Sequence, residues 1–202
     1  MGLCTLPEGT FCQAITDDDC AQAEACTKHG ACKAWAGICV SDLAGSDPLS
    51  PICDAVEVTG LTASASSEHK ATPPYHFEAS QLVDRDRRTS WQPDSKKGGV
   101  GEVITLKLPA PARLARLDVA NGFQLRDMLG DLFAMNNRAA RVLVRAGGVT
   151  VAATLPADGR GFAPISLPPV STDKLTIEIL TVEKGWRWND LALTELRVYS
   201  CR

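Results

Sequence analysis

Cysteine is distributed very unevenly along this chain, and the distribution limits what its two ends can fold into. Of the eight cysteines in 202 residues, six lie near the N-terminus. These six are Cys4, Cys12, Cys20, Cys26, Cys32 and Cys39. No two cysteines have the Cys-x-x-Cys spacing, and the sequence contains only three histidines. The combination favours disulfides over zinc or redox chemistry and predicts an oxidising compartment.

The cysteine-rich segment, residues 1–42, is predicted to be a small disulfide-rich module. It has few large apolar side chains, so cross-links must replace a packed core. It carries a formal charge of −4 and the rest of the chain +1, out of a total of −3. Neither part is basic enough to indicate nucleic-acid binding. Asp17, Asp18 and Asp19 predict a cap on a short helix over residues 21–27, because an EF-hand would need a different oxygen spacing.

A linker and a secreted location follow from the same end of the chain. Residues 43–52 are small, polar and proline-bearing, which is typical of a linker. No apolar run approaches the ~18 residues that a membrane-spanning helix needs. The first three residues cannot form the apolar part of a signal peptide. We therefore expect a signal peptide to have been removed from a secreted or surface-displayed protein, and a lipid anchor at Cys4 stays open.

From Cys53 onward the pattern changes to short alternating segments separated by Gly, Pro, Asn and Asp, which is typical of an antiparallel β-sandwich. A period of two places the apolar side chains of a strand on one face. The predicted inner face consists of Ile104, Leu106, Leu108, Ala115, Leu117, Val119, Val142, Val144, Leu175, Ile177, Ile179, Leu196 and Val198. Residues 53–201 are therefore predicted to form one all-β domain without a long amphipathic helix.

Two motifs give this domain a resemblance to a known family. Residues 82–91 read LVDRDRRTSW, and residues 185–196 read GWRWNDLALTEL. Together they resemble the discoidin-like (coagulation-factor C-type) antiparallel jelly-roll β-sandwich, which is used for glycan binding. Residues 121–126 and 136–142 add a more specific likeness, to the translocation domain of a secreted bacterial NAD-glycohydrolase toxin. In that subgroup the domain binds glycans and the enzyme is a separate unit, so the resemblance implies no catalysis here.

Two further expectations come from resemblance. Residues 17–39 resemble a short cysteine-rich repeat of secreted proteins from myxobacteria and their relatives, which indicates a bacterial lineage and an exported protein. Discoidin-like domains commonly join their ends by a disulfide, so the resemblance implies that Cys53 pairs with Cys201. Closing a loop of nearly 150 residues removes denatured-state entropy equivalent to about 5 kcal/mol in the chain-entropy model.

The family resemblance also implies a cation site at Asp84, Asp86, Thr89 and Glu195. Carboxylate, hydroxyl and carbonyl oxygens suit calcium, which takes six to eight oxygen ligands, and do not suit zinc. Arg85 stands where the family usually has Gly, at a turn that needs a positive φ. Asp84, Asp86 and Thr89 are equally suited to capping the turn by local hydrogen bonds. A structural calcium and a metal-free turn therefore both stay open.

The segment 121–141 is the candidate ligand loop, because it is long for a strand connection and such loops are often functional. A sugar site needs an aromatic ring beside amide and guanidinium groups. The residues that supply these groups are Phe123, Arg126, Asn136 and Arg138, with Trp186 as a further aromatic contact. Phe123 is predicted to stack on a sugar face. The alternative is that Phe123, Leu132 and Phe133 close the end of the sandwich.

Catalytic motifs are missing from the sequence. It contains neither a Gly-x-Ser-x-Gly elbow nor a His-Glu-x-x-His helix. Asp84 and Asp86 lie in one turn and cannot flank a glycosidase cleft, and His69 and His76 are expected to be solvated loop residues. The leading hypothesis is a non-catalytic, lectin-like protein that binds cell-surface or matrix glycans. The alternative is an interaction or assembly module that docks an envelope protein through the same loops, and an enzyme ranks third.

Overall fold

The computed structural model describes residues 17–21, 24–29, 32–35, 38–40 and 53–202. The predicted linker, together with Cys4 and Cys12, lies outside the described residues. The elements before the sandwich are α1 (Asp17–Ala21), α2 (Glu24–His29), β1 (Lys33–Trp35) and β2 (Ile38–Val40). Those of the sandwich are β3 (Ala55–Glu57), β4 (Thr62–Ala65), η1 (Ala79–Val83), β5 (Val103–Asn121), β6 (Arg126–Asp127), β7 (Gly130–Asp131), α3 (Leu132–Met135), β8 (Arg138–Ala146), β9 (Val149–Thr154), β10 (Phe162–Ser166), β11 (Ser171–Glu183) and β12 (Leu193–Cys201).

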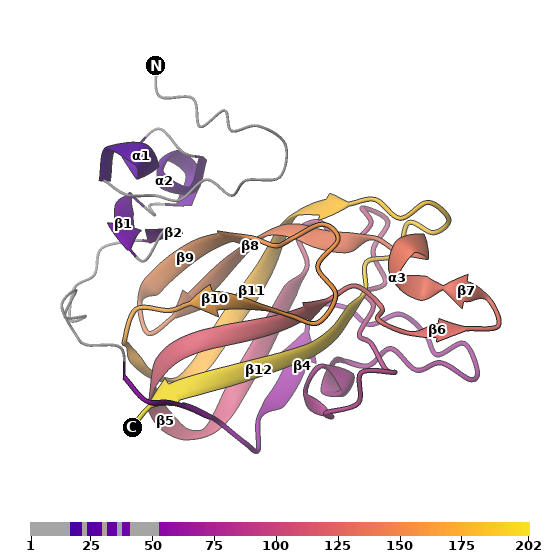
Figure 1. Cartoon of the computed structure of the whole chain (residues 1–202), viewed down its shortest axis with the longest axis horizontal. Coiled ribbons are helices and arrows are strands. Elements are labelled where there is room, and N and C mark those ends of the chain that lie inside the picture. The colour runs from indigo at the N-terminus through magenta and orange to yellow at the C-terminus, as the bar shows by residue number, and fades with distance from the viewer. Residues whose placement is uncertain (1–16, 22–23, 30–31, 36–37, 41–52) are drawn as a thin grey trace.

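The sandwich is organised around β5, which is long enough to take part in both of its layers (Figure 1). The first half of β5 pairs with β4 and β11, and β11 continues through β8 to β9. The second half pairs with β10 and β12, and β12 pairs with β3. All these pairs are antiparallel. The predicted all-β antiparallel sandwich is confirmed.

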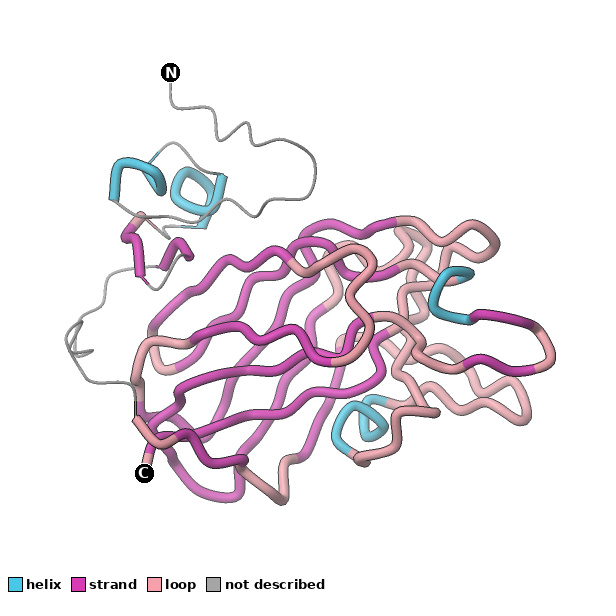
Figure 2. The backbone as a smooth tube through the Cα atoms, in the orientation of Figure 1, coloured by secondary structure: helices cyan, strands magenta, loops and turns pink. Residues whose placement is uncertain are grey.

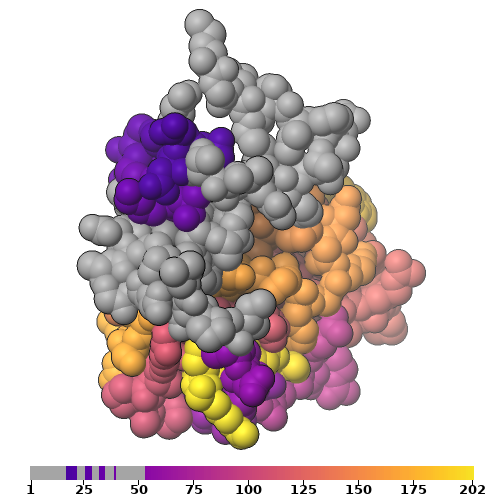
Figure 3. Space-filling view, turned by 60° about the vertical axis from the view of Figure 1, so that its left-hand side comes forward, coloured from indigo at the N-terminus to yellow at the C-terminus, as the bar shows by residue number. Residues whose placement is uncertain are grey.

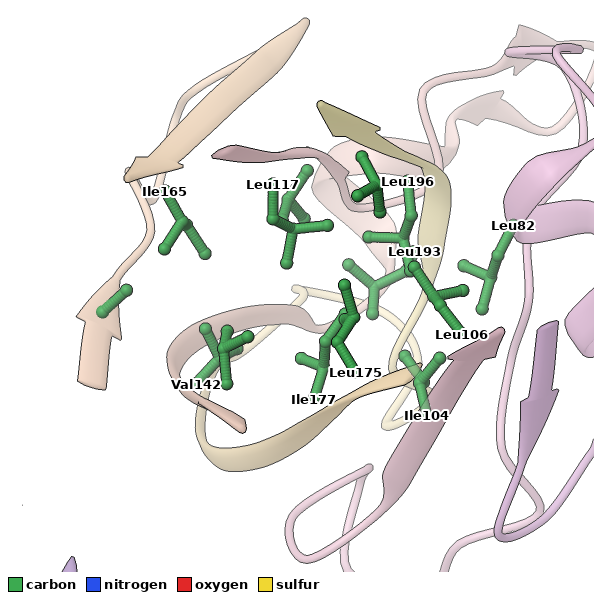
Figure 4. Packing of buried hydrophobic residues seen from close by; sticks show 14 of the residues in the cluster. Leu82, Ile104, Leu106, Leu117, Val142, Ile165, Leu175, Ile177, Leu193 and Leu196 are labelled. Atoms are coloured by element: carbon green, nitrogen blue, oxygen red, sulfur yellow. The ribbon is translucent and has the colours of Figure 1, made fainter. Parts of the chain in front are cut away.

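The core lies between the two layers, where side chains from one sheet face those of the other (Figure 4). Of the residues predicted for the inner face, every one except Ala115 is buried. The β12 register shifts at this point, so that Tyr199 faces Arg116 while Ser200 faces Leu114. Ala115 is the extra residue of a β-bulge, and a bulge reverses which side chains point inward. Leu114, fully buried, takes the place in the core that the alternation assigned to Ala115.

The N-terminal module contacts the sandwich through a strand. Strand β2 pairs antiparallel with β9 and so extends the sheet at its edge. Two disulfides, Cys20–Cys39 and Cys26–Cys32, cross-link the described part of the module. The predicted single helix over residues 21–27 is wrong, because α1 and α2 are separate short helices. The carboxylate of Asp17 instead accepts hydrogen bonds from Lys33 Nζ and the Ala34 N–H, both at 2.9 Å, which ties α1 to β1.

The two ends of the sandwich differ in construction. At one end the Cys53–Cys201 disulfide joins the start of the domain to the last strand, and Figure 3 shows the yellow C-terminal strand beside the purple segment that leads into β3. At the other end lie most of the long loops, together with α3, β6 and β7 (Figure 2). Within the described residues, no helix combines the length and apolar character that crossing a membrane requires.

Candidate functional site

A pocket of about 220 Å³ opens at the loop end of the sandwich. Its walls come from four connections: the β4–η1 loop, the segment after η1, the β5–β8 connection and the β11–β12 loop. The lining residues are His69, Thr72, Tyr75, Phe77, Gln92, Phe123, Leu129, Leu132, Asn136, Trp188 and Asp190. Since drug-sized ligands occupy pockets of ~300 Å³ or more, this one suits a small polar ring.

Aromatic rings make up much of the pocket wall. A tight turn, in which the Thr72 and Tyr75 backbones exchange hydrogen bonds of 3.0 and 2.8 Å, brings Tyr75 to the pocket. The Tyr75 ring stacks near Phe77 at 6.3 Å and meets Phe123 edge to face at 6.0 Å. These three residues belong to a second apolar cluster, separate from the main core, which Trp188 also joins. The cluster therefore gives the pocket a preformed aromatic floor.

Two amide side chains in the pocket wall have polar atoms without a hydrogen-bond partner. Gln92 is only 6% exposed, and its side-chain amide makes no hydrogen bond to any described residue. Asn136 is 3% exposed; its Nδ2 donates to the Leu132 carbonyl at 2.9 Å, while no described group donates to its Oδ1. Neither amide has an atom among the described side-chain atoms that are both fully buried and unpaired, so the free atoms face the open pocket and are available to pair with a ligand.

The β11–β12 loop is held in place by Asn137, which is fully buried. Its Nδ2 donates to the Asn189 carbonyl at 3.1 Å, and its Oδ1 accepts the Gly185 N–H at 3.0 Å. A Cβ on Gly185 would lie 2.2 Å from the Met135 carbonyl oxygen, so the loop approaches α3 as closely as only glycine permits. These contacts fix Trp188 and Asp190 at the pocket wall.

Only part of the predicted ligand set lines this pocket. Phe123 is 3% exposed and Asn136 forms part of the wall. The Arg138 guanidinium is buried instead, and it donates to the carbonyls of Phe133, Asn136 and Ala157 at 2.9, 3.3 and 2.9 Å. These bonds hold the connection together, because the buried carbonyls of Phe133 and Asn136 would otherwise lack this donor.

The remaining two predicted ligand contacts lie on the surface beside the pocket. Arg126 is exposed and its guanidinium lies 3.4 Å from Asp131, which Arg160 also contacts at 2.5 Å. Trp186 is 68% exposed. Trp188, two residues further along the loop, is half-buried and lines the pocket. The other tryptophan singled out by the motif, Trp91, is fully buried in the core.

The predicted cation turn makes dense local hydrogen bonds. Asp84 Oδ1 accepts the Asp86 N–H and Oδ2 accepts the Thr89 hydroxyl, both at 2.8 Å. The Asp86 carboxylate pairs with Arg88 at 2.7 Å, which lowers the pKa of Asp86 to about 2. Arg85 has a φ of 66°, the conformation expected of the glycine it replaces, and its guanidinium contacts Glu57 at 2.6 Å.

Glu195 links β12 to this turn. It is 1% exposed, and its Oε2 accepts the Arg85 N–H at 3.1 Å. Burial raises the pKa of Glu195 to about 7, with Arg197 opposing and Asp84 adding to the shift. Asp84, Thr89 and Glu195 carry oxygen atoms of the kind that calcium takes, but among the described residues no three His, Cys, Asp or Glu side chains gather into a metal-ligand cluster. The Asp86 carboxylate is engaged by Arg88.

A second hollow, of about 350 Å³, lies at the β8–β9 hairpin and is formed by residues 145–150 and 174–176. No aromatic side chain lines it, so it lacks the feature that distinguishes the pocket at the loop end. Sequence reasoning missed most of that pocket, namely His69, Thr72, Tyr75, Phe77, Gln92, Leu129, Leu132, Trp188 and Asp190. One available signal was the pair Tyr75 and Phe77, two aromatic residues in a proline-bearing polar loop.

The comparisons with known proteins identify the family. A model of the NAD glycohydrolase translocation F5/8 type C domain matches residues 54–199. The chain belongs to this family. None of the curated proteins that were searched matches it. The family match covers the sandwich with its loop-end pocket and confirms the resemblance drawn from the two motifs.

Solved structures share the F5/8 type C architecture at low sequence identity. A family 32 carbohydrate-binding module from Clostridium perfringens, in complex with galactose, has 17% identity and a TM-score of 0.51, over 69% of this chain and 93% of that one. Another family 32 module from the same organism, part of a family 31 glycoside hydrolase, has 20% identity and a TM-score of 0.53, over 73% and 95%. An F5/8 type C domain from Bacteroides fragilis has 17% identity and a TM-score of 0.53, over 76% and 99%. These likenesses establish the fold.

Proposed function

We propose that this F5/8 type C protein is a non-catalytic carbohydrate-binding protein that takes a terminal sugar into the loop-end pocket. The observation that carries the proposal is the aromatic pocket whose wall presents free amide atoms of Gln92 and Asn136. A sugar ring offers apolar C–H faces to aromatic rings and hydroxyl groups to amides. The galactose complex of a family 32 module supports the proposal, since that module has the same fold.

The roles differ from those that the sequence suggested. Phe123 contributes to the aromatic floor together with Tyr75, while Trp188 offers a half-buried ring at the wall. Gln92, Asn136 and Asp190 are the groups proposed to hydrogen-bond sugar hydroxyls. Arg138 is a positioning residue, because its guanidinium is engaged by three backbone carbonyls.

A secreted or surface location and a structural calcium complete the proposal. The described disulfides support an oxidising environment, and binding to cell-surface or matrix glycans requires the same location. Calcium, when bound, would join the Asp84 turn to β12 through Asp84, Thr89 and Glu195. Its role would be structural, because none of these three residues lines the pocket.

A glycan array with the oxidised protein, followed by calorimetric titration of the best ligand, tests the function. Trp188→Ala should weaken binding roughly tenfold or more, since aromatic contacts and the water they exclude contribute on the order of 1–2 kcal/mol. Lys174→Ala, at the β8–β9 hollow, is the control and should leave the affinity unchanged. Equal affinities of the two variants would place the site elsewhere, and an array without any binding would remove the proposal.

One observation favours the alternative, a protein-docking module. Among the described residues, the exposed large apolar side chains are Met128, Leu129 and Trp186, at 103%, 46% and 68%. All three belong to the loop end, and exposed apolar residues that gather in one place often mark interaction sites. Met128→Ser with Trp186→Ser should abolish docking of a protein partner but leave the affinity for a small glycan unchanged.

A further inference from the structure

The charge of the pocket restricts which sugars it can accept, provided that the proposed glycan function holds. Among its lining residues Asp190 is the one carboxylate, and lysine and arginine do not line it. No described residue forms a side-chain hydrogen bond or ion pair with that carboxylate. The nearest arginines along the loops are engaged elsewhere: the Arg187 guanidinium lies over the Trp188 ring at 4.7 Å, and Arg126 faces Asp131.

The neutral polar groups of the pocket are also mostly acceptors. Asn136 Nδ2 donates to the Leu132 carbonyl, so that only its Oδ1, an acceptor, is free for a ligand. The Tyr75 hydroxyl donates to Asp127, which raises the pKa of Tyr75, so the oxygen of the neutral phenol is left as an acceptor. His69 Nδ1 lies 2.8 Å from the Lys70 carbonyl, which can only accept; the proton of the neutral ring therefore resides on Nδ1 and Nε2 accepts.

Donors in the pocket are few by comparison. Gln92 has an amide NH₂ group and Thr72 a hydroxyl, and each of these two side chains also contains an acceptor oxygen; the Trp188 indole N–H is a donor only. An ammonium group on a sugar has three N–H donors, no acceptor and a positive charge, so it complements such a site. A sugar carboxylate would bring a second negative charge beside Asp190, with no basic lining residue to neutralise it. An acetamido group would remove the charge and add an acceptor oxygen.

We infer that the pocket selects a terminal aminosugar with a free ammonium group, which pairs with Asp190, over neutral and N-acetylated sugars, and that it rejects acidic sugars. The aromatic floor of Tyr75, Phe77 and Phe123 holds the ring of any of these sugars. Asp190 supplies the discrimination. Its loop is fixed from the backbone side, where the Asn137 N–H donates to the Asp190 carbonyl at 2.9 Å, so the side chain can be changed without removing that anchor.

The test uses methyl glycosides of the gluco and galacto series, each with an amino, acetamido or hydroxyl group at C2, and the corresponding uronic acids. Affinities are measured by calorimetry at neutral pH and low salt for the full chain and for Asp190→Asn. In the wild type, the amino sugar of the preferred series should bind about tenfold more tightly than the neutral sugar, as one partly desolvated charge pair allows, and the uronic acid most weakly. Asp190→Asn should equalise the amino and neutral sugars, and thermal melting checks that it is folded.

The outcomes separate this inference from the proposed function. Binding of neutral sugars with no amino preference, or a preference that Asp190→Asn leaves intact, would overturn the inference while the glycan function stands. Equal or tighter binding of uronic acids would overturn it as well. If no glycoside of either series binds and the array is blank, both proposals fail together. Added salt provides a further check, since it should reduce the amino preference and leave the neutral affinity unchanged.

Discussion

The Asp84–Thr89 turn and the loop-end pocket are both rich in polar residues, but they use them in opposite ways. In the turn, Asp84, Asp86 and Thr89 find partners within a few residues of one another. In the pocket, Gln92 is more deeply buried than any of these and its amide has no partner among the described residues. Polar groups that satisfy one another build structure, whereas groups left unpaired at an open pocket wall are available to an external ligand.

Glu195, which contacts the turn, does not fit this contrast. Its carboxyl is buried, accepts the Arg85 N–H and lies close enough to Asp84 for the two charges to repel. Such a group has two ways to be accommodated, either by taking up a proton or by binding a cation. The turn is therefore self-sufficient except at this one carboxyl, and the contrast between turn and pocket can be tested at both places.

The largest expected effect concerns Arg138. Arg138→Met should lower the free energy of unfolding by about 3–5 kcal/mol, because three carbonyls lose a buried charged donor. Arg126→Met, which changes an exposed ion pair, should cost less than about 0.5 kcal/mol. Urea denaturation measures both. If Arg138→Met were as stable as the wild type but bound glycan more weakly, Arg138 would be a direct ligand contact. Its structural role would then be wrong.

Next in size is the pH dependence set by Glu195. The folded protein retains the Glu195 proton up to about pH 7, whereas the unfolded chain releases it near 4.5. The folded state therefore binds more protons between these values, and its stability should fall as the pH rises through that window, by at most about 3 kcal/mol. Glu195→Gln should remove the slope in urea titrations with chelator. The lowered pKa of Asp86, about 2, acts only at lower pH.

The same urea titrations in the presence of calcium test whether a cation binds at Glu195. A bound cation would favour the ionised carboxylate, so saturating calcium should remove the fall in stability and add about 2–3 kcal/mol at a hundredfold excess over its dissociation constant. Asp84→Ala should abolish the calcium effect. Melting curves that stay the same with calcium and with chelator, on metal-free protein, would establish the turn as capped by its own hydrogen bonds.

The sandwich was largely predictable because its residues obey a local rule. Alternation assigned the inner faces correctly except at Ala115, where a bulge changed the phase. Bulges depend on how two strands pair, and a single strand's sequence does not encode its partner's register. A positive φ at position 85 was also predicted, because the family usually has a glycine there. The structure places Arg85 there at 66°.

The pocket was predictable only in part, because it depends on which distant loops meet. Phe123 and Asn136 were found since they lie in one long connection, while Gln92 and Asp190 reach the same space from loops about a hundred residues apart. The chemical type of a side chain did not predict its role. Arg138 has a guanidinium group that could bind a sugar, but this group donates to backbone carbonyls instead. Whether a polar side chain already has hydrogen-bond partners depends on tertiary packing, and a sequence motif does not contain that information.

The smallest expected effect is also the sharpest test of the contrast, because it applies one substitution to two glutamines. Gln124 donates to the Asn121 and Gly161 carbonyls at 3.1 and 3.0 Å and accepts the Gly161 N–H at 3.0 Å, whereas the Gln92 amide has no described partner. Gln124→Leu should therefore lose about 2 kcal/mol of stability and retain the affinity for glycan. Gln92→Leu should retain stability, since leucine fits an apolar cluster, and weaken binding about tenfold, or about 1.4 kcal/mol. Urea denaturation and calorimetry on both variants give the four values. If Gln92→Leu bound normally, its unpaired amide would not be the mark of a ligand, and the strongest argument for the pocket would be lost.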